Sequence, residues 1–308
     1  MIGTQLALVK REVWEHRSLY VVPAVLALVV TLTTITGQVA VSSFGQQIDI
    51  AILGASNLGE TERSAALNVF MLSMSWIFVL TMGIMTTFYA LDALYAERKD
   101  KSILFWRSLP VTDAETVVSK LLTAVVLIPA VTFAVIAATH LLVLVISSAW
   151  ISMRGAEGWS MIWSAVPLFD NWMATLISLI ALSIWVSPFV GWFLFVSAFA
   201  KRSPFLFAFL PLIVLPMLER ILIGSNVFFE TMVSRAPFAV PIIKSFSEDS
   251  LDFDSEEQLL ELAQSGVSLL SVIDVGRFLS SPGVWLGLVV CGVFSAAAIY
   301  VRRYRDES

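Results

Sequence analysis

The sequence predicts an all-α integral membrane protein with six transmembrane helices. Of its 308 residues, 58% are hydrophobic and only 14% are charged, whereas soluble domains carry about 25% charged residues. The mean hydropathy is +0.85. A spanning helix needs about 20 predominantly apolar residues, and six stretches of this kind lie between charged residues. Composition and pattern therefore agree on a membrane protein.

The rest of the composition excludes several functions. A net charge of −5 without a clustered basic face argues against nucleic-acid binding. A single cysteine, Cys291, excludes an internal disulfide. With only two histidines, His16 and His140, and no H-E-x-x-H motif, we expect no metal or other cofactor in this chain and no catalytic activity of its own.

Residues 1–18 are predicted to form an amphipathic helix at the membrane interface. Ile2, Leu6, Val9 and Val13 fall on one helical face, and such a helix lies in the headgroup region of a bilayer. A simple extension of the first span into the cytoplasm is the alternative.

Residues 19–224 are expected to hold the first five spans. The first covers residues 19–38, and the next three lie within 63–92, 120–154 and 170–201, each bounded by charged residues. Several uncharged runs exceed about 25 residues, so these helices are expected to tilt or to reach into the headgroups.

The fifth span contains Pro204, Pro211 and Pro216. Only 16 residues separate Arg202 from Glu219, which gives about 24 Å of helix at 1.5 Å per residue, less than the roughly 30 Å apolar core of a bilayer. We expect a kinked helix that continues past Glu219 at its outer end. A helix broken at a proline is the alternative.

Residues 225–282 are expected to form a small extracytoplasmic subdomain, followed by the sixth span at 283–302 and a cytoplasmic tail at 303–308. An acidic block occupies residues 247–264. Asp252, Asp254 and Glu256 have the spacing of a calcium loop, but Glu257 stands where that loop needs glycine. A short capped helix is the favoured interpretation of this block.

The distribution of lysine and arginine predicts the orientation. With the N-terminus inside, thirteen of these residues fall on the inner side and six on the outer side. Cytoplasmic loops carry the excess of positive charge, so both termini are expected in the cytoplasm.

The inner loop after the second span has an unusual composition. Glu97 and Lys101 have the i,i+4 spacing of a helical ion pair, and the apolar sequence ILFW follows at 103–106. Pro110 then ends the helix, and Thr112 with Glu115 makes a capping box for the third span. Apolar residues surrounded by charges are typical of a protein contact, so residues 97–107 are expected to form a docking helix; a solvated turn is the alternative.

This stretch, LYAERKDKSILFWRSLPVTDAETVVSKLL, resembles the cytoplasmic loop of the six-span permease subunits of bacterial ATP-binding-cassette exporters, a family that includes permeases for multicopper-enzyme maturation. The family pattern maps onto Glu97-Arg98, Ser102, residues 109–112 and Ser119-Lys120. The resemblance implies a permease in the bacterial inner membrane that forms a homodimer and binds two separate ATPase subunits.

The resemblance also implies that residues 97–107 are the coupling helix that meets the ATPase subunit. The expected contact residues are Glu97, Arg98, Lys99, Asp100, Lys101, Ile103, Phe105, Trp106 and Arg107. The chain lacks the phosphate-binding motif G-x-x-x-x-G-K-[ST], so ATP and Mg²⁺ are expected on the partner chain.

Two other functions remain open at this point. A proton-coupled secondary transporter could use His140 with the threonines of the spans, although the sequence has no inverted repeat of the kind such carriers carry. A non-transporting membrane sensor or scaffold is the other alternative. The few ionisable residues in the spans favour an apolar or amphipathic substrate over a small ion.

Overall fold

The computed structural model describes residues 2–43, 45–102, 111–243 and 268–304. Within them the secondary structure is helical apart from one isolated antiparallel bridge, between Ile243 and Ile273. The helices are α1 (Ile2–Glu15), α2 (Ser18–Ser42), α3 (Gln46–Ser56), α4 (Glu60–Lys99), α6 (Asp113–Leu122), the π-helix η1 (Thr123–Leu127), α7 (Ile128–Met153), α8 (Gly158–Trp163), α9 (Leu168–Trp185), α10 (Ser187–Phe199), α11 (Pro204–Leu222), α12 (Val227–Val233), the 3₁₀ helix η2 (Pro237–Ala239), α14 (Leu269–Val272), α15 (Val275–Ser280) and α16 (Pro282–Tyr304).

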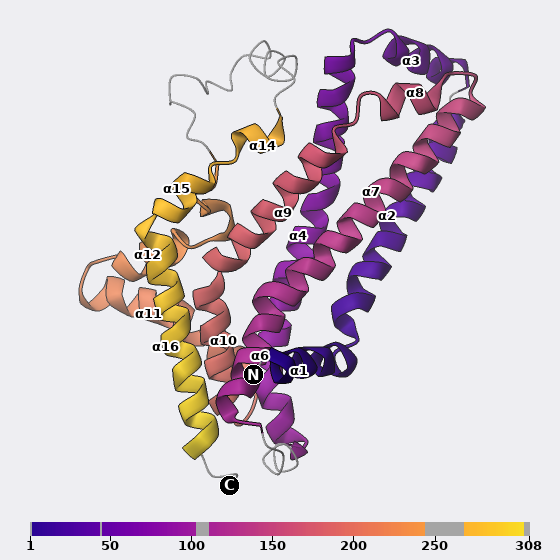
Figure 1. Ribbon diagram of the computed structural model, residues 1–308. Coiled ribbons are helices and arrows are strands. Elements are labelled where there is room, and N and C mark those ends of the chain that lie inside the picture. Colours follow the sequence, from indigo (N-terminus) through magenta and orange to yellow (C-terminus); the bar gives the residue numbers. More distant parts are fainter. Residues whose placement is uncertain (1, 44, 103–110, 244–267, 305–308) are drawn as a thin grey trace.

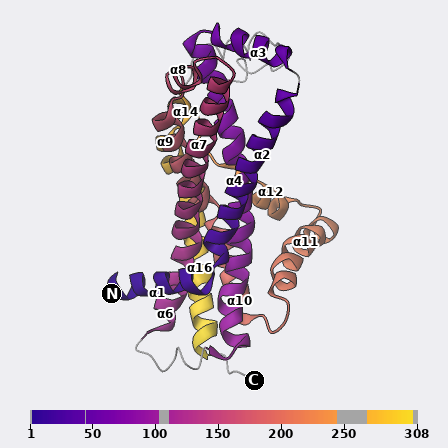
Figure 2. The same ribbon diagram turned by 90° about the vertical axis from the view of Figure 1, so that its right-hand side faces the viewer.

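In the described residues, six helical segments are long and apolar enough to cross a membrane, which confirms the predicted all-α fold with six candidate spans. They are α2, α4, the continuous segment Asp113–Met153, α9, α11 and α16. Most of the long helices run side by side, and α1 and the end of α16 lie towards the same end of the bundle (Figure 1). Helices α3 and α8 lie across the opposite end, and Figure 2 shows the same arrangement from the side. The chain is therefore a multi-pass membrane protein.

The fourth span is broken, which the sequence analysis did not predict. Helix α9 ends at Trp185, and α10 begins at Ser187 with Pro188 in its first turn. Proline lacks a backbone donor and disfavours the helical conformation in the residue before it. In contrast, the fifth span α11 is a single helix that contains Pro211 and Pro216 and continues past Glu219.

The core lies where α4, α6, α10 and α16 meet. Phe78, Leu94 and Leu194 are almost completely buried there. A Cβ atom at Gly191 of α10 would stand 2.9 Å from the carbonyl oxygen of Cys291 in α16, so the missing side chain permits this close approach. Only 6% of the apolar stretch of α11 is buried, so most of that helix lies on the surface of the described structure.

Helix α1 lies across the end of the bundle, at a large angle to α2 (Figures 1 and 2). Its face towards the protein differs from the predicted apolar face, because Leu8 and Glu12 are buried while Leu6 is 66% exposed. Leu6 and Trp14 are exposed. A buried glutamate on this helix needs a partner, and the partner lies in α6.

The segment 225–282 contains α12, η2, α14 and α15 in its described parts. Ile242 accepts a hydrogen bond from the backbone of Asp274 at 2.7 Å, which joins the two sides of this segment. The acidic block, with the calcium-like spacing and the expected capped helix, lies outside the described residues.

Candidate functional site

The two ends of the loop expected to couple to a partner have defined structures. Helix α4 ends at Lys99. At the other end, Thr112 and Glu115 form the predicted capping box: Thr112 Oγ1 accepts from the Glu115 backbone at 3.2 Å, and Glu115 Oε2 accepts from the Thr112 backbone at 2.9 Å. The capping box fixes where α6 begins, and with it the position of Lys120 two turns later.

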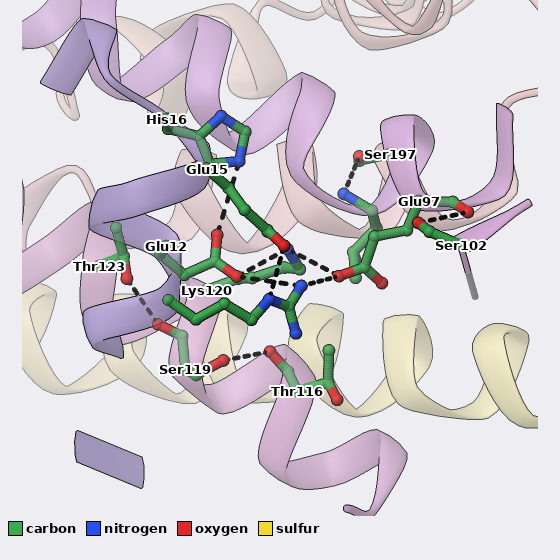
Figure 3. A network of polar contacts seen from close by, with 12 residues as sticks. Glu12, Glu15, His16, Glu97, Ser102, Thr116, Ser119, Lys120, Thr123 and Ser197 are labelled. Carbon is green, nitrogen blue, oxygen red and sulfur yellow. Dashed lines mark hydrogen bonds and ion pairs between the residues drawn. The ribbon is translucent and has the colours of Figure 1, made fainter. Parts of the chain in front are cut away.

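Lys120 lies at the centre of a buried charge network (Figure 3). Its Nζ is 3.0 Å from Glu12 Oε1 of α1 and 3.1 Å from Glu97 Oε1 of α4. The side chains of Lys120, Glu12 and Glu97 are 0%, 1% and 6% exposed. An unpaired charge at such a depth would be strongly unfavourable, because burial removes its hydration.

Two arginines complete the network. Arg11 of α1 donates to Glu97 Oε1 at 2.8 Å, and Arg302 of α16 donates to Glu97 Oε2 at 2.6 Å. Arg302 also donates to Asp113 Oδ1 of α6 at 2.8 Å. Three carboxylates, on Glu12, Glu97 and Asp113, thus meet three cations, on Arg11, Lys120 and Arg302. We call these six residues the charge network.

The charge network joins four elements that are far apart in the sequence: α1, the end of α4, the start of α6 and the end of α16. Two of these ends flank the loop 100–112. Because ion pairs at low exposure resist separation, a displacement of either end of the loop has to move the attached helices or break a buried pair. The network therefore ties the loop mechanically to the bundle.

Tyr89 and His16 border the network on one side. Tyr89 Oη donates to Glu12 Oε2 at 2.7 Å, and the His16 ring packs edge-on against the Tyr89 ring with 5.0 Å between centroids. Glu12, Glu15 and His16 are close enough together to hold a metal ion. The Glu12 oxygens already accept from Lys120 and Tyr89, however, and Glu15 accepts from Arg11, so ion pairs account for this cluster.

The expected contact residues divide into three groups. Glu97 and Arg98 turn towards the bundle: Glu97 belongs to the charge network, and Arg98 donates to the carbonyls of Ser197 and Ala200 at the end of α10, at 2.6 and 2.9 Å. Lys99, Asp100 and Lys101 are exposed. Ile103, Phe105, Trp106 and Arg107 lie outside the described residues.

The predicted helical pair of Glu97 with Lys101 is corrected by the structure. Helix α4 ends two residues before Lys101, which has a positive φ of 57°, so the i,i+4 geometry is lost. Glu97 pairs with Arg11, Lys120 and Arg302 instead. Glu97 and Arg98 therefore hold the loop to the protein, and the exposed residues beyond them remain available to a partner.

Sequence reasoning missed Arg11, Glu12, Asp113 and Arg302 as site residues. Glu12 could have been identified as a site residue from the sequence, because it lies four residues before His16 and shares a helical face with Leu8. Lys120 was recognised only as part of the permease-family pattern, in Ser119-Lys120. Its pairing with Glu97 brings two parts of that pattern, Glu97-Arg98 and Ser119-Lys120, into contact.

His140, the candidate for proton coupling, lies in the middle of α7 and is completely buried. Its Nε2 is 3.2 Å from Ser75 Oγ of α4. The pair joins the second and third spans at a distance from the charge network, and this kind of polar contact commonly links helices in a membrane.

No protein-family model matches the chain, and neither a curated protein nor a solved structure does.

Proposed function

We propose that the chain is the permease subunit of an ATP-binding-cassette exporter, driven by a separate ATPase subunit that docks on the loop 97–107. The observation that carries the proposal is the charge network. It attaches the end of α4 and the start of α6, which flank this loop, to α1 and α16. The side chains of Glu12, Glu97, Lys120 and Arg302 in these pairs are at most 6% exposed.

An ATP-driven permease without its own ATPase site has to receive mechanical work from a separate ATPase subunit. The loop needs a surface for the partner and a rigid connection to the spans. The exposed residues Lys99, Asp100 and Lys101 and the apolar residues that follow them supply the first. The charge network supplies the second, because it holds the end of α4 and the start of α6 against the end of α16.

The remaining parts of the proposal follow from the same pattern. The end of α4, α1 and the end of α16 lie at one end of the bundle (Figure 1), and the excess of lysine and arginine favours this end as the cytoplasmic one. The membrane is the bacterial inner membrane, α1 lies in its inner headgroup layer, and a second copy of the chain completes the path through which substrate moves. ATP and Mg²⁺ bind to the ATPase subunit.

Affinity purification of the full chain from its native membranes tests this function. The expected result is a stoichiometric ATPase subunit carrying a phosphate-binding loop, with ATP hydrolysis by the complex and none by the purified chain alone. ATP hydrolysis by the isolated chain would contradict the proposal. So would ion-driven uptake into vesicles that contain the chain alone, which is the result expected of a secondary transporter.

A further inference from the structure

A groove of about 550 Å³ opens in the side of the bundle between α4, η1, α9, α10, α11 and η2. The volume lies within the range of about 300–1,000 Å³ that is usual for small-molecule sites. Trp76, Leu80 and Ile84 on its rim are more than half exposed, so a molecule dissolved in the bilayer can reach it sideways.

Two irregular stretches of backbone line this groove. Ala124 and Val125 come from the π-helix η1, and Val186 stands at the break between α9 and α10. Short π-helical turns are frequent at functional sites. Irregular backbone at membrane depth is tolerated mainly where it is buried in protein or lines a cavity, and here both stretches line the same groove.

Thr86 supplies an independent sign that the groove takes a ligand. It lines the groove, is only 8% exposed, and its Oγ1 is buried without a hydrogen-bond partner. Threonines elsewhere in the spans, such as the adjacent Thr87, donate to the carbonyl four residues earlier. A buried hydroxyl without a partner is costly, and a ligand in the groove would satisfy it.

The remaining lining defines the chemistry of the ligand. The described residues that line the groove include no charged side chain, and most of them are aliphatic or aromatic. A charged ligand would lose its hydration without compensation. An apolar ligand with one polar group would match both the walls and Thr86.

We propose that this groove binds an uncharged, largely apolar molecule that enters from the bilayer and forms one hydrogen bond with Thr86. That this molecule is also the exported substrate rests on the proposed function. The binding site itself does not, because it is formed within a single chain and away from the loop that would meet the ATPase subunit.

Benzophenone is a suitable probe, since it is uncharged, has an apolar body and one carbonyl acceptor, and attaches covalently to nearby C–H bonds under ultraviolet light. The purified full chain in lipid vesicles, without an ATPase subunit, is labelled at increasing probe concentrations and the modified residues are mapped by mass spectrometry. We expect saturable labelling of groove residues such as Met82. Diphenylmethane, which has the same body without the carbonyl, should compete more weakly.

Two pairs of variants separate binding from partition into the lipid. Gly83→Phe should abolish saturable labelling, because Gly83 lines the groove and a Cβ there meets nothing within 4 Å; the control Gly292→Phe, equally open in α16, should leave it unchanged. Thr86→Val should weaken benzophenone binding by roughly threefold to tenfold, the effect of one lost hydrogen bond. Thr87→Val, whose hydroxyl is already bonded to Gly83, should have little effect.

Labelling that rises linearly with probe concentration over the lipid-facing residues, or that survives Gly83→Phe, would overturn the proposed site. Saturable labelling in a chain that recruits no ATPase subunit would leave the site standing and overturn the exporter assignment. The two proposals can therefore fail separately.

Discussion

Lys120→Met is expected to destabilise the protein by about 3–5 kcal/mol, the usual cost of removing one partner from a buried ion pair. Lys120 Nζ lies 3.0 and 3.1 Å from two carboxylates. At an effective dielectric constant near 20, each pair contributes about 5 kcal/mol of attraction. Several kcal/mol of this offset the dehydration of the lysine itself, and the variant also leaves Glu12 and Glu97 with less compensation.

The assay measures unfolding of the purified chain in detergent, induced by heat in one experiment and by denaturant in another. Methionine preserves most of the apolar stem of lysine, so a loss of packing contributes little. Lys99→Met is the matched control: Lys99 is exposed on the last turn of α4, and surface changes of this kind stay within about 0.5 kcal/mol.

The double variant Lys120→Met with Glu97→Gln separates charge from shape. Because Glu97→Gln removes part of the uncompensated charge, the double variant should be more stable than the sum of the two single effects indicates. A loss below about 1 kcal/mol for Lys120→Met, or strictly additive effects, would refute the interpretation of the network as a buried, mutually dependent set of charges.

Three other predictions concern the packing of α10 on α16, the cap of α6 and the membrane topology. Gly191→Leu should cost about 1–3 kcal/mol in an unfolding assay, because a Cβ atom there meets the backbone of Cys291; an unchanged midpoint would contradict the close packing of α10 on α16. Thr112→Val should cost about 1 kcal/mol through loss of the α6 cap, clearly less than Lys120→Met, and an equal or larger loss would contradict this ranking. In a background without native cysteine, a cysteine at Ser56 should react with a membrane-impermeant thiol reagent in intact cells while one at Lys99 should not; the opposite pattern would invert the topology.

The spans were predictable from sequence because their signal is local. Twenty apolar residues between charges specify a spanning helix, and the capping box at Thr112 and Glu115 specified where α6 begins. Even the break in the fourth span has a local sign in Pro188, which disfavours the helical conformation at Ser187. Helix α11 accommodates its prolines without a break.

The charge network was not predictable in the same way, because its members come from distant segments. Arg302 pairs with Glu97, 205 residues earlier, and a pairing over such a distance leaves no periodic pattern. The i,i+4 rule for helical ion pairs predicted Lys101 as the partner of Glu97. Helix α4 ends at Lys99, however, before Lys101 can take that position. Likewise, nothing in the sequence distinguishes Thr86 from Thr87, since only the packing decides which hydroxyl lacks a partner.

Binding of the separate ATPase subunit to loop variants tests the proposed function most directly. In chains that insert at normal levels, Phe105→Ala and Trp106→Ala should each weaken binding by about 2 kcal/mol or more, as expected for apolar anchors at a protein contact, or uncouple ATP hydrolysis from transport. Lys99→Ala should cost less than about 1 kcal/mol. If both aromatic variants bind the ATPase subunit and transport as well as the unmodified chain, the loop does not transmit the energy of ATP hydrolysis.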